Sequence, residues 1–220
     1  MKRLVLCLLA AAAASPAFAQ KLPDYRAASG KWANQGGRAY QNDPAARLAK
    51  ANIRAPQSGS MLYAFNVRYE SGGEDGHGGF GLHIFADSAV DGPSWGCGNS
   101  YLLWLNYDEK PLKSTGIAPG LTGQVYRSYS HTRMELVHNI DLNQYAGLLT
   151  AENLAEPVSF RIWANGDTGE VRIYDPTDPY YATYYVFTAD KKTLPLKGNW
   201  AAVRTNGLRM SFAPEEDPEE

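Results

Sequence analysis

Pro157-Val-Ser-Phe-Arg-Ile-Trp-Ala-Asn-Gly-Asp-Thr-Gly-Glu-Val-Arg-Ile-Tyr174 contains two runs in which apolar and polar residues alternate. The segment between them, 165–169, is built from residues that tolerate positive φ and favour a tight turn. Two further runs of the same kind follow at 182–188 and 198–204. Because no helical periodicity competes with this pattern, the last third of the chain predicts antiparallel β-sheet.

The rest of the chain extends the same pattern. Further strands are expected at 61–69, 80–85, 100–107, 124–129, 133–140 and 207–212, with a short strand pair around Gly36 and Gly37. About ten to twelve strands separated by Gly, Pro and Asn are typical of a sandwich or barrel. Residues 70–79 are expected to form a glycine-rich loop, 43–51 a helical turn capped by Asp43, and 141–156 a short helix.

The two ends of the chain differ from this body. Lys2 and Arg3 precede an apolar stretch too short to span a bilayer, and Ala17-Phe-Ala19 is a typical signal-peptidase site. We expect a signal peptide over 1–19, cleavage after Ala19, a secreted or periplasmic location and no membrane insertion after cleavage. The remaining chain divides into an N-terminal segment at 20–31, one sandwich domain at 32–213 and an acidic, disordered tail at 214–220.

Charge and cysteine content limit which partners the protein can bind and how its fold can be stabilised. Without residues 1–19 the chain carries 19 basic and 23 acidic residues, so its near-neutral body offers no basic patch for nucleic acid. Cys97 is then the only cysteine, which excludes an internal disulfide and leaves stability to the hydrophobic core. We interpret Cys97 as a small buried apolar residue, with a reactive loop thiol as the alternative.

A series of short motifs carries a resemblance to a known superfamily. The motifs are, in order, Trp32 with Gly36-Gly37, Phe65-Asn-Val-Arg68, Gly79-Phe-Gly-Leu-His-Ile84, Asn99-Ser-Tyr-Leu-Leu-Trp104, Phe160-Arg-Ile-Trp163, Ala202-Val-Arg204 and Ser211-Phe212. Over 32–213 this order resembles the concanavalin A-like lectin/glucanase superfamily, in the style of laminin-G-type domains. The resemblance implies an all-β jelly-roll sandwich of two curved antiparallel sheets with a concave face. It also implies polysaccharide binding or cleavage.

The catalytic signatures of that superfamily are incomplete in this chain. The glucanase pattern Glu-x-Asp-x-x-Glu is absent, and Arg133-Met-Glu-Leu136 is similar only to the first half of the alginate-lyase motif Arg-x-Glu-Leu-Arg. Val137 replaces the second arginine, and no Gln-x-His follows. Cleavage of a polysaccharide therefore stays an alternative, in which Glu135 or His83 acts as acid or base and Arg127 or Arg133 stabilises charge.

Strand alternation yields a candidate ligand site. Four strands each place polar and aromatic side chains opposite an apolar face. If these strands share one sheet, the polar face forms a groove where rings stack on sugars and charged groups bind hydroxyls. The candidate ligand-binding residues are His83, Trp104, Arg127, Arg133, Glu135, Arg161 and Trp163. The alternative is that they are ordinary solvent-facing strand residues.

No cofactor or metal is expected, because the four histidines lack the close spacing of zinc ligands. Calcium bound near Glu70, Glu74 and Asp75, or between Asp175 and Asp178, is an alternative to turn chemistry. We predict an exported, lectin-like carbohydrate-binding protein without an identifiable catalytic motif. A glycoside hydrolase or lyase, or a structural envelope protein that binds another protein, are the alternatives, so whether the protein is an enzyme stays open.

Overall fold

The structure, a computed structural model, describes residues 22, 24–147, 150 and 152–215. The predicted signal peptide and all of the acidic tail beyond Glu215 lie outside these residues. Glu215 itself forms an ion pair, in which its Oε2 lies 2.7 Å from Nε of Arg161. No helix among the described residues is long and apolar enough to cross a membrane.

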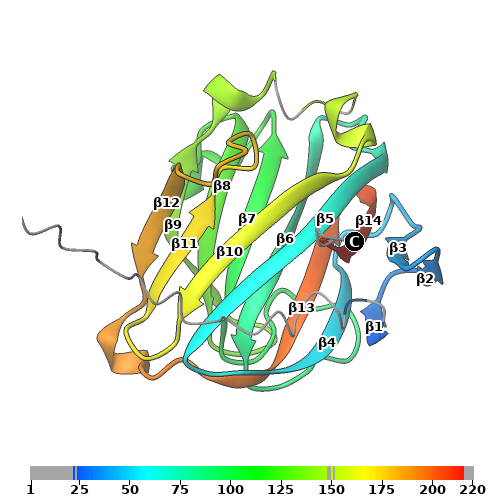
Figure 1. Ribbon diagram of the computed structural model, residues 1–220. Helices are drawn as coiled ribbons and strands as arrows, with labels where there is room; N and C mark the ends of the chain where they lie inside the picture. Colours follow the sequence, from blue (N-terminus) through cyan, green and yellow to red (C-terminus); the bar gives the residue numbers. More distant parts are fainter. Residues whose placement is uncertain (1–21, 23, 148–149, 151, 216–220) are drawn as a thin grey trace, which may run out of the picture.

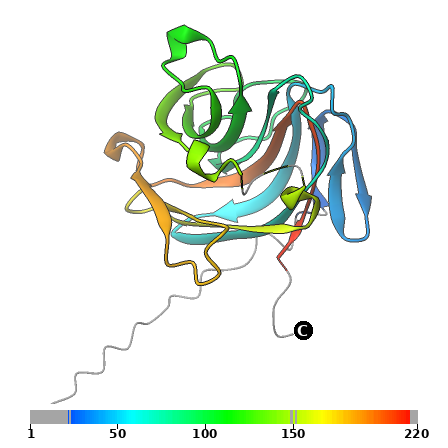
Figure 2. The same ribbon diagram turned by 90° about the horizontal axis from the view of Figure 1, so that it is seen from above.

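Two antiparallel sheets of seven strands each are packed face to face (Figure 1). We call them sheet I and sheet II. Sheet I contains, in spatial order, β1 (Arg26–Ser29), β4 (Ala49–Gln57), β13 (Gly198–Asn206), β6 (His77–Ala86), β7 (Ser100–Asp108), β8 (Gly120–Ser128) and β9 (Met134–Asp141). Sheet II contains β12 (Tyr184–Thr188), β11 (Glu170–Tyr174), β10 (Val158–Asn165), β5 (Ser60–Gly72), β14 (Leu208–Pro214), β3 (Arg38–Gln41) and β2 (Trp32–Gln35). Viewed from above, the strand β12 and the pair β2–β3 lie at opposite ends of the molecule (Figure 2).

The core lies between the sheets and is built from the apolar face of each strand. Phe80 of sheet I packs edge-on against Phe160 of sheet II, with ring centroids 5.4 Å apart. Tyr101 and Phe187 make a second inter-sheet contact at 5.9 Å. Alternation along β5 follows the expected period of two, since Met61, Tyr63, Phe65 and Val67 are buried and their neighbours are less so. The predicted two-sheet, all-β sandwich is therefore confirmed.

Several local expectations need correction. The expected helical turn at 43–51 is limited to a turn at its start, where Ala45 N donates to Asp43 Oδ1, and the chain then enters β4. Residues 26–29 form the edge strand β1, which pairs with β4. The expected loop at 70–79 shrinks to four residues, 73–76, because β5 ends at Gly72 and β6 begins at His77.

The described part of 141–156 contains no α-helix. It holds two 3-10 helices, η3 (Asn143–Tyr145) and η4 (Asn153–Ala155). A third, η2 (Lys113–Thr115), lies between β7 and β8, and a fourth, η5 (Lys191–Thr193), between β12 and β13.

Candidate functional site

Sheet I has a hollow on each of its faces. On the face turned away from the core, a groove of about 400 Å³ crosses strands β13, β6, β7 and β8. We call this the outer groove. Its lining includes Trp95, Trp104, Asn106, Gln124, Tyr126 and Arg204. Strand alternation places these β7, β8 and β13 side chains opposite the core residues Leu103, Val125 and Val203.

Trp104 forms the floor of the outer groove and is 7% exposed. Its indole lies against the backbone of β6, because a Cβ at Gly79 would stand 2.5 Å from Trp104 Cζ2 and one at Gly81 2.9 Å from Cε3. The indole Nε1 donates to Asn106 Oδ1 at 3.0 Å. The two glycines therefore make the space in which this tryptophan is fixed.

Arg204 lies beside Trp104 and is almost fully buried, at 4% exposed. Its guanidinium carbon is 4.9 Å from the Trp104 ring centroid and 5.3 Å from that of Trp95, both within the range of cation–π attraction. Nη1 donates to the Trp95 carbonyl oxygen at 3.1 Å, whereas Nε has no hydrogen-bond partner. Burial lowers the pKa of Arg204 to about 10.

One wall of the outer groove belongs to the loop 87–99, which covers the adjacent part of sheet I. Lys50 anchors this loop, since its Nζ donates to the carbonyl oxygens of Ser94 at 2.9 Å and Gly96 at 2.7 Å. Asn52 Nδ2 donates to the Val90 carbonyl oxygen at 2.8 Å. Trp95, held between the Lys50 contacts, is 59% exposed and presents its ring to solvent at the groove.

Beside Leu102 and Trp104, the lining from β7 and β8 includes the hydrogen-bonded side chains of Asn106, Gln124 and Tyr126. Tyr126 Oη donates to Gln124 Oε1 at 2.7 Å, and Gln124 Nε2 donates to Thr122 Oγ1 at 2.9 Å. Amide groups present both donors and acceptors, and a phenol does the same. Together with an exposed indole, this chemistry suits a polyhydroxylated ligand with one apolar face.

The seven residues proposed from sequence are divided among four places. Trp104 lies in the outer groove, as described. His83 is on the same face of sheet I but is fully buried under the loop 87–99, where Nδ1 is 3.0 Å from Ser100 Oγ. Burial, and then the charges of Lys50 and Arg204, hold the pKa of His83 well below its usual range.

A second group gathers around Tyr129 at the ends of β8 and β9. The guanidinium carbons of Arg127 and Arg133 lie 5.4 and 4.8 Å from the Tyr129 ring centroid. The Tyr129 hydroxyl donates to Glu135 Oε2 at 2.9 Å. These residues contact one another, but none of them lines the outer groove.

Arg161 and Trp163 belong to β10 of sheet II, on the other side of the molecule's core. Arg161 pairs with Glu215 and stacks on Tyr181 at 4.1 Å, and Trp163 contacts the guanidinium of Arg172 at 4.9 Å. The expected single groove required all these strands to share one sheet, and they do not.

Alternation placed Trp104 and Trp163 on the outer faces of their sheets, but Arg127 lies on the core side of sheet I, with its guanidinium carbon 5.0 Å from the ring centroid of the core residue Tyr101. Alternation also does not say which strands are neighbours.

Sequence reasoning missed Trp95, Asn106, Gln124, Tyr126 and Arg204. Arg204 sits in a run that was assigned to a strand, so its position opposite Ala201 and Val203 could have flagged it as a polar residue on the outer face. Trp95 belongs to a loop, and no periodic signal places a loop residue over a sheet.

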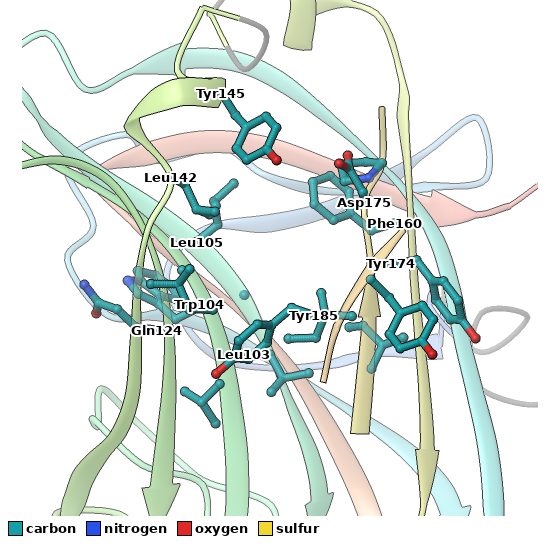
Figure 3. Close-up of a pocket in the computed structure, with 18 of the residues that line it drawn as sticks. Leu103, Trp104, Leu105, Gln124, Leu142, Tyr145, Phe160, Tyr174, Asp175 and Tyr185 are labelled. Atoms are coloured by element: carbon teal, nitrogen blue, oxygen red, sulfur yellow. The ribbon is translucent and has the colours of Figure 1, made fainter. Parts of the chain in front are cut away.

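The second hollow lies between the sheets, and its lining includes Ile140 of β9 and Tyr185 of β12. We call it the inter-sheet cavity; its volume is about 350 Å³. Leu103, Leu105 and Leu142 line it from the side of sheet I, and Phe160 and Tyr185 from sheet II (Figure 3). Tyr145 and Asp175 lie near one end of it (Figure 3). Strands β7 and β8 separate the two hollows, and Trp104 and Gln124 contribute to both.

Nowhere in 24–147 or 152–215 do three or more His, Cys, Asp or Glu residues gather in a way that could hold a metal ion. Two of the carboxylates in the calcium alternatives have other partners: Asp75 pairs with Arg47 at 2.8 Å, and Asp175 Oδ1 accepts a hydrogen bond from the backbone N–H of Thr177 at 2.8 Å.

Comparison with known proteins identifies the fold. No family model and no curated protein sequence matches the chain. Among solved structures, a protein of unknown function with a galectin-like fold from Bacillus subtilis aligns with a TM-score of 0.56 at 12% identity, over 90% of this chain and 91% of that one. Peanut lectin aligns with a TM-score of 0.53 at 13% identity, over 90% and 93%. The CBM2 module of the evolved Dit of Lactobacillus casei BL23 phage J-1 aligns at 0.50 and 12% identity, over 84% and 76%. The chain thus has the concanavalin A-like, lectin-type jelly-roll fold, and identities this low show the fold alone.

Proposed function

We propose that the protein is an exported carbohydrate-binding protein whose ligand lies in the outer groove. The observation that carries the proposal is the exposed ring of Trp95 in the same groove as the hydrogen-bonded side chains of Asn106, Gln124 and Tyr126. An indole face stacks on the apolar face of a pyranose, while amide, phenol and guanidinium groups take its hydroxyls. The lectin-like fold of the structural neighbours supports this use of the face, although fold does not fix function.

Binding is favoured over cleavage by the chemistry of the groove lining. Most glycosidases use two carboxyl groups that flank the scissile bond. Among the described residues that line the groove, Asp108 is the one carboxylate. His83, proposed from sequence as an acid or base, is fully buried beneath the loop 87–99, and Glu135 lies with Tyr129 outside the groove.

Export is the second part of the proposal and rests on the sequence of residues 1–19. Expression in a bacterial host with a functional secretion system, followed by mass spectrometry of the mature chain, tests it. We expect a chain that begins at Gln20. A mature protein that retains Met1 would contradict export by this route.

The binding proposal is tested by screening the mature protein against immobilised polysaccharides of plant, algal and bacterial origin. We expect retention on at least one polymer, reversed by soluble oligosaccharide of the same composition. Retention that soluble oligosaccharide does not reverse, or retention on none of the polymers, would contradict a carbohydrate site.

The inter-sheet cavity favours a second candidate function, the binding of a small uncharged molecule with an apolar body. Its volume lies at the lower end of the usual range for small-molecule sites, and its walls are leucine and aromatic side chains. The carboxylate of Asp175 at its end disfavours a fatty-acid head group. Nile red, a neutral apolar dye, tests this: we expect its fluorescence to rise with wild type and with Arg204→Met, but not with Ile140→Trp, which fills the cavity. Equal signals from all three proteins would refute it.

A further inference from the structure

We infer that the ligand of the outer groove is an acidic saccharide whose carboxylate pairs with Arg204. This inference rests on the proposed carbohydrate site and names the class of sugar that the site selects. It is carried by the unusual state of one side chain, a buried guanidinium without a counter-ion on the floor of an open groove.

The burial of Arg204 is the first step of the argument. Moving a charged group out of water costs free energy that a protein normally offsets with an opposite charge. None of the ion pairs among the described residues includes Arg204. Within the described residues, Arg204 donates one hydrogen bond, from Nη1 to the Trp95 carbonyl oxygen, and its Nε has no partner. The side chain therefore keeps donor capacity that the protein itself does not use.

A second buried cation reinforces the local charge. Lys50 is the cross-strand neighbour of Arg204 in the β13–β4 pair, and its relative exposure is 0%. The contacts of its ammonium are the neutral oxygens of Ser94 and Gly96. Asp87, an exposed carboxylate at the start of the same loop, accepts hydrogen bonds from Asn99 and forms no ion pair with either cation. The floor of the groove at this end is thus positive.

The opposite end of the groove has the opposite sign. Asp108 lines it four residues beyond Trp104 on β7, which is roughly 13 Å along the strand. His77 is the cross-strand partner of Asp108 and lies at the same end. A carboxylate on the ligand is therefore attracted to the Arg204 end and repelled from the Asp108 end, which gives the ligand a direction.

The geometry of arginine suits a carboxylate in particular. Its planar fork of N–H groups matches two carboxylate oxygens, and such charge-assisted bonds are stronger than neutral ones. The rings of Trp95 and Trp104 hold the guanidinium and so reduce the entropy that it would lose on binding. A uronic acid would place its ring against Trp95 while its carboxylate meets Arg204.

The experiment compares acidic oligosaccharides with their own methyl esters, which keep the shape and remove the charge. Trimers of galacturonate, mannuronate and guluronate, each with its ester, are titrated into wild type, Arg204→Met and Asp108→Asn by calorimetry. We expect at least one acid to bind wild type about tenfold or more tightly than its ester. Arg204→Met should abolish that preference, and Asp108→Asn should keep it. Arg204→Lys keeps the charge but lacks the planar fork, so it should retain part of the preference for the acid over its ester.

The outcomes separate the inference from the function on which it rests. Neutral esters that bind as tightly as the acids, with Arg204→Met unchanged, would overturn the acidic ligand and leave the carbohydrate site intact. If no acid, ester or neutral oligosaccharide binds wild type, both fail. Melting curves show whether each variant is folded. If Arg204→Met does not fold, a folded Arg204→Lys is compared with wild type in its place.

Discussion

The guanidinium carbon of Arg204 lies 4.9 Å from the ring centroid of Trp104, and the indole in turn rests on the backbone of β6. This arrangement depends on two glycines, because a side chain at either position would occupy the place of the ring. The position of Trp104, and with it the contact to the charged Arg204, therefore depends on the Gly-Phe-Gly sequence of β6.

Replacing Gly79 with alanine should therefore disturb both stability and binding. The new Cβ would stand 2.5 Å from Trp104 Cζ2 and 2.8 Å from the Leu105 carbonyl oxygen, which is backbone and cannot easily move. We expect a loss of about 1–3 kcal/mol in the free energy of unfolding, measured with urea. Gly147→Ala is the control, since its Cβ would meet nothing within 4 Å. Equal stabilities of the two variants would show that Trp104 is not held in this way.

The buried Lys50 should make stability depend on pH. Burial, which outweighs the neighbouring Cys97, lowers the pKa of Lys50 from 10.5 to about 8. Above pH 8 the folded protein releases this proton while the unfolded chain keeps it, so the contribution of Lys50 to stability rises with pH and is lost as pH falls through 8.

We expect the unfolding free energy of wild type minus that of Lys50→Met to increase by about 1 kcal/mol from pH 7 to pH 9. The range stops at pH 9 because Cys97, whose pKa is raised, acts in the opposite direction above that value. Urea titrations at pH 7, 8 and 9 provide the measurement. A difference that stays constant, or falls, would mean that Lys50 keeps its proton in the fold.

Cys97 should be inert in the native protein. It is 0% exposed, and burial raises its pKa to about 11, so little thiolate forms at neutral pH. We expect Ellman's reagent to leave Cys97 unmodified at pH 7.5 and to modify it fully in urea. Rapid reaction without denaturant would contradict both the burial of Cys97 and the closed position of the loop above it.

The fold could be predicted from sequence where one face of a strand is buried and the other is not. Strands β5 and β10 alternate in this way, because sheet II is exposed on its outer face. Strand β4 was missed since the loop 87–99 covers its outer face and buries Lys50 and Asn52 as well as the core side. A strand buried on both faces has no period of two to detect.

The site was less predictable than the fold, because its residues meet only through strand order and a loop. Trp104 was found from its place on β7, but Arg161 and Trp163 share its character and lie on the other sheet. Nothing local in the sequence distinguishes them. Trp95 reaches the groove through the contacts of Lys50 with its neighbours Ser94 and Gly96, which join residues more than forty positions apart.

Trp95→Ala tests the carbohydrate site most directly, because the ring is 59% exposed and its removal leaves the core intact. The affinity of the best oligosaccharide from the screen is measured by calorimetry for wild type, Trp95→Ala and Tyr180→Ala. Tyr180 has an exposed ring and belongs to the segment that joins β11 to β12 of sheet II. We expect Trp95→Ala to weaken binding by roughly 1–2 kcal/mol, the value of a lost stacking contact, and Tyr180→Ala to leave it unchanged. Wild-type affinity in Trp95→Ala would contradict a ligand site in the outer groove.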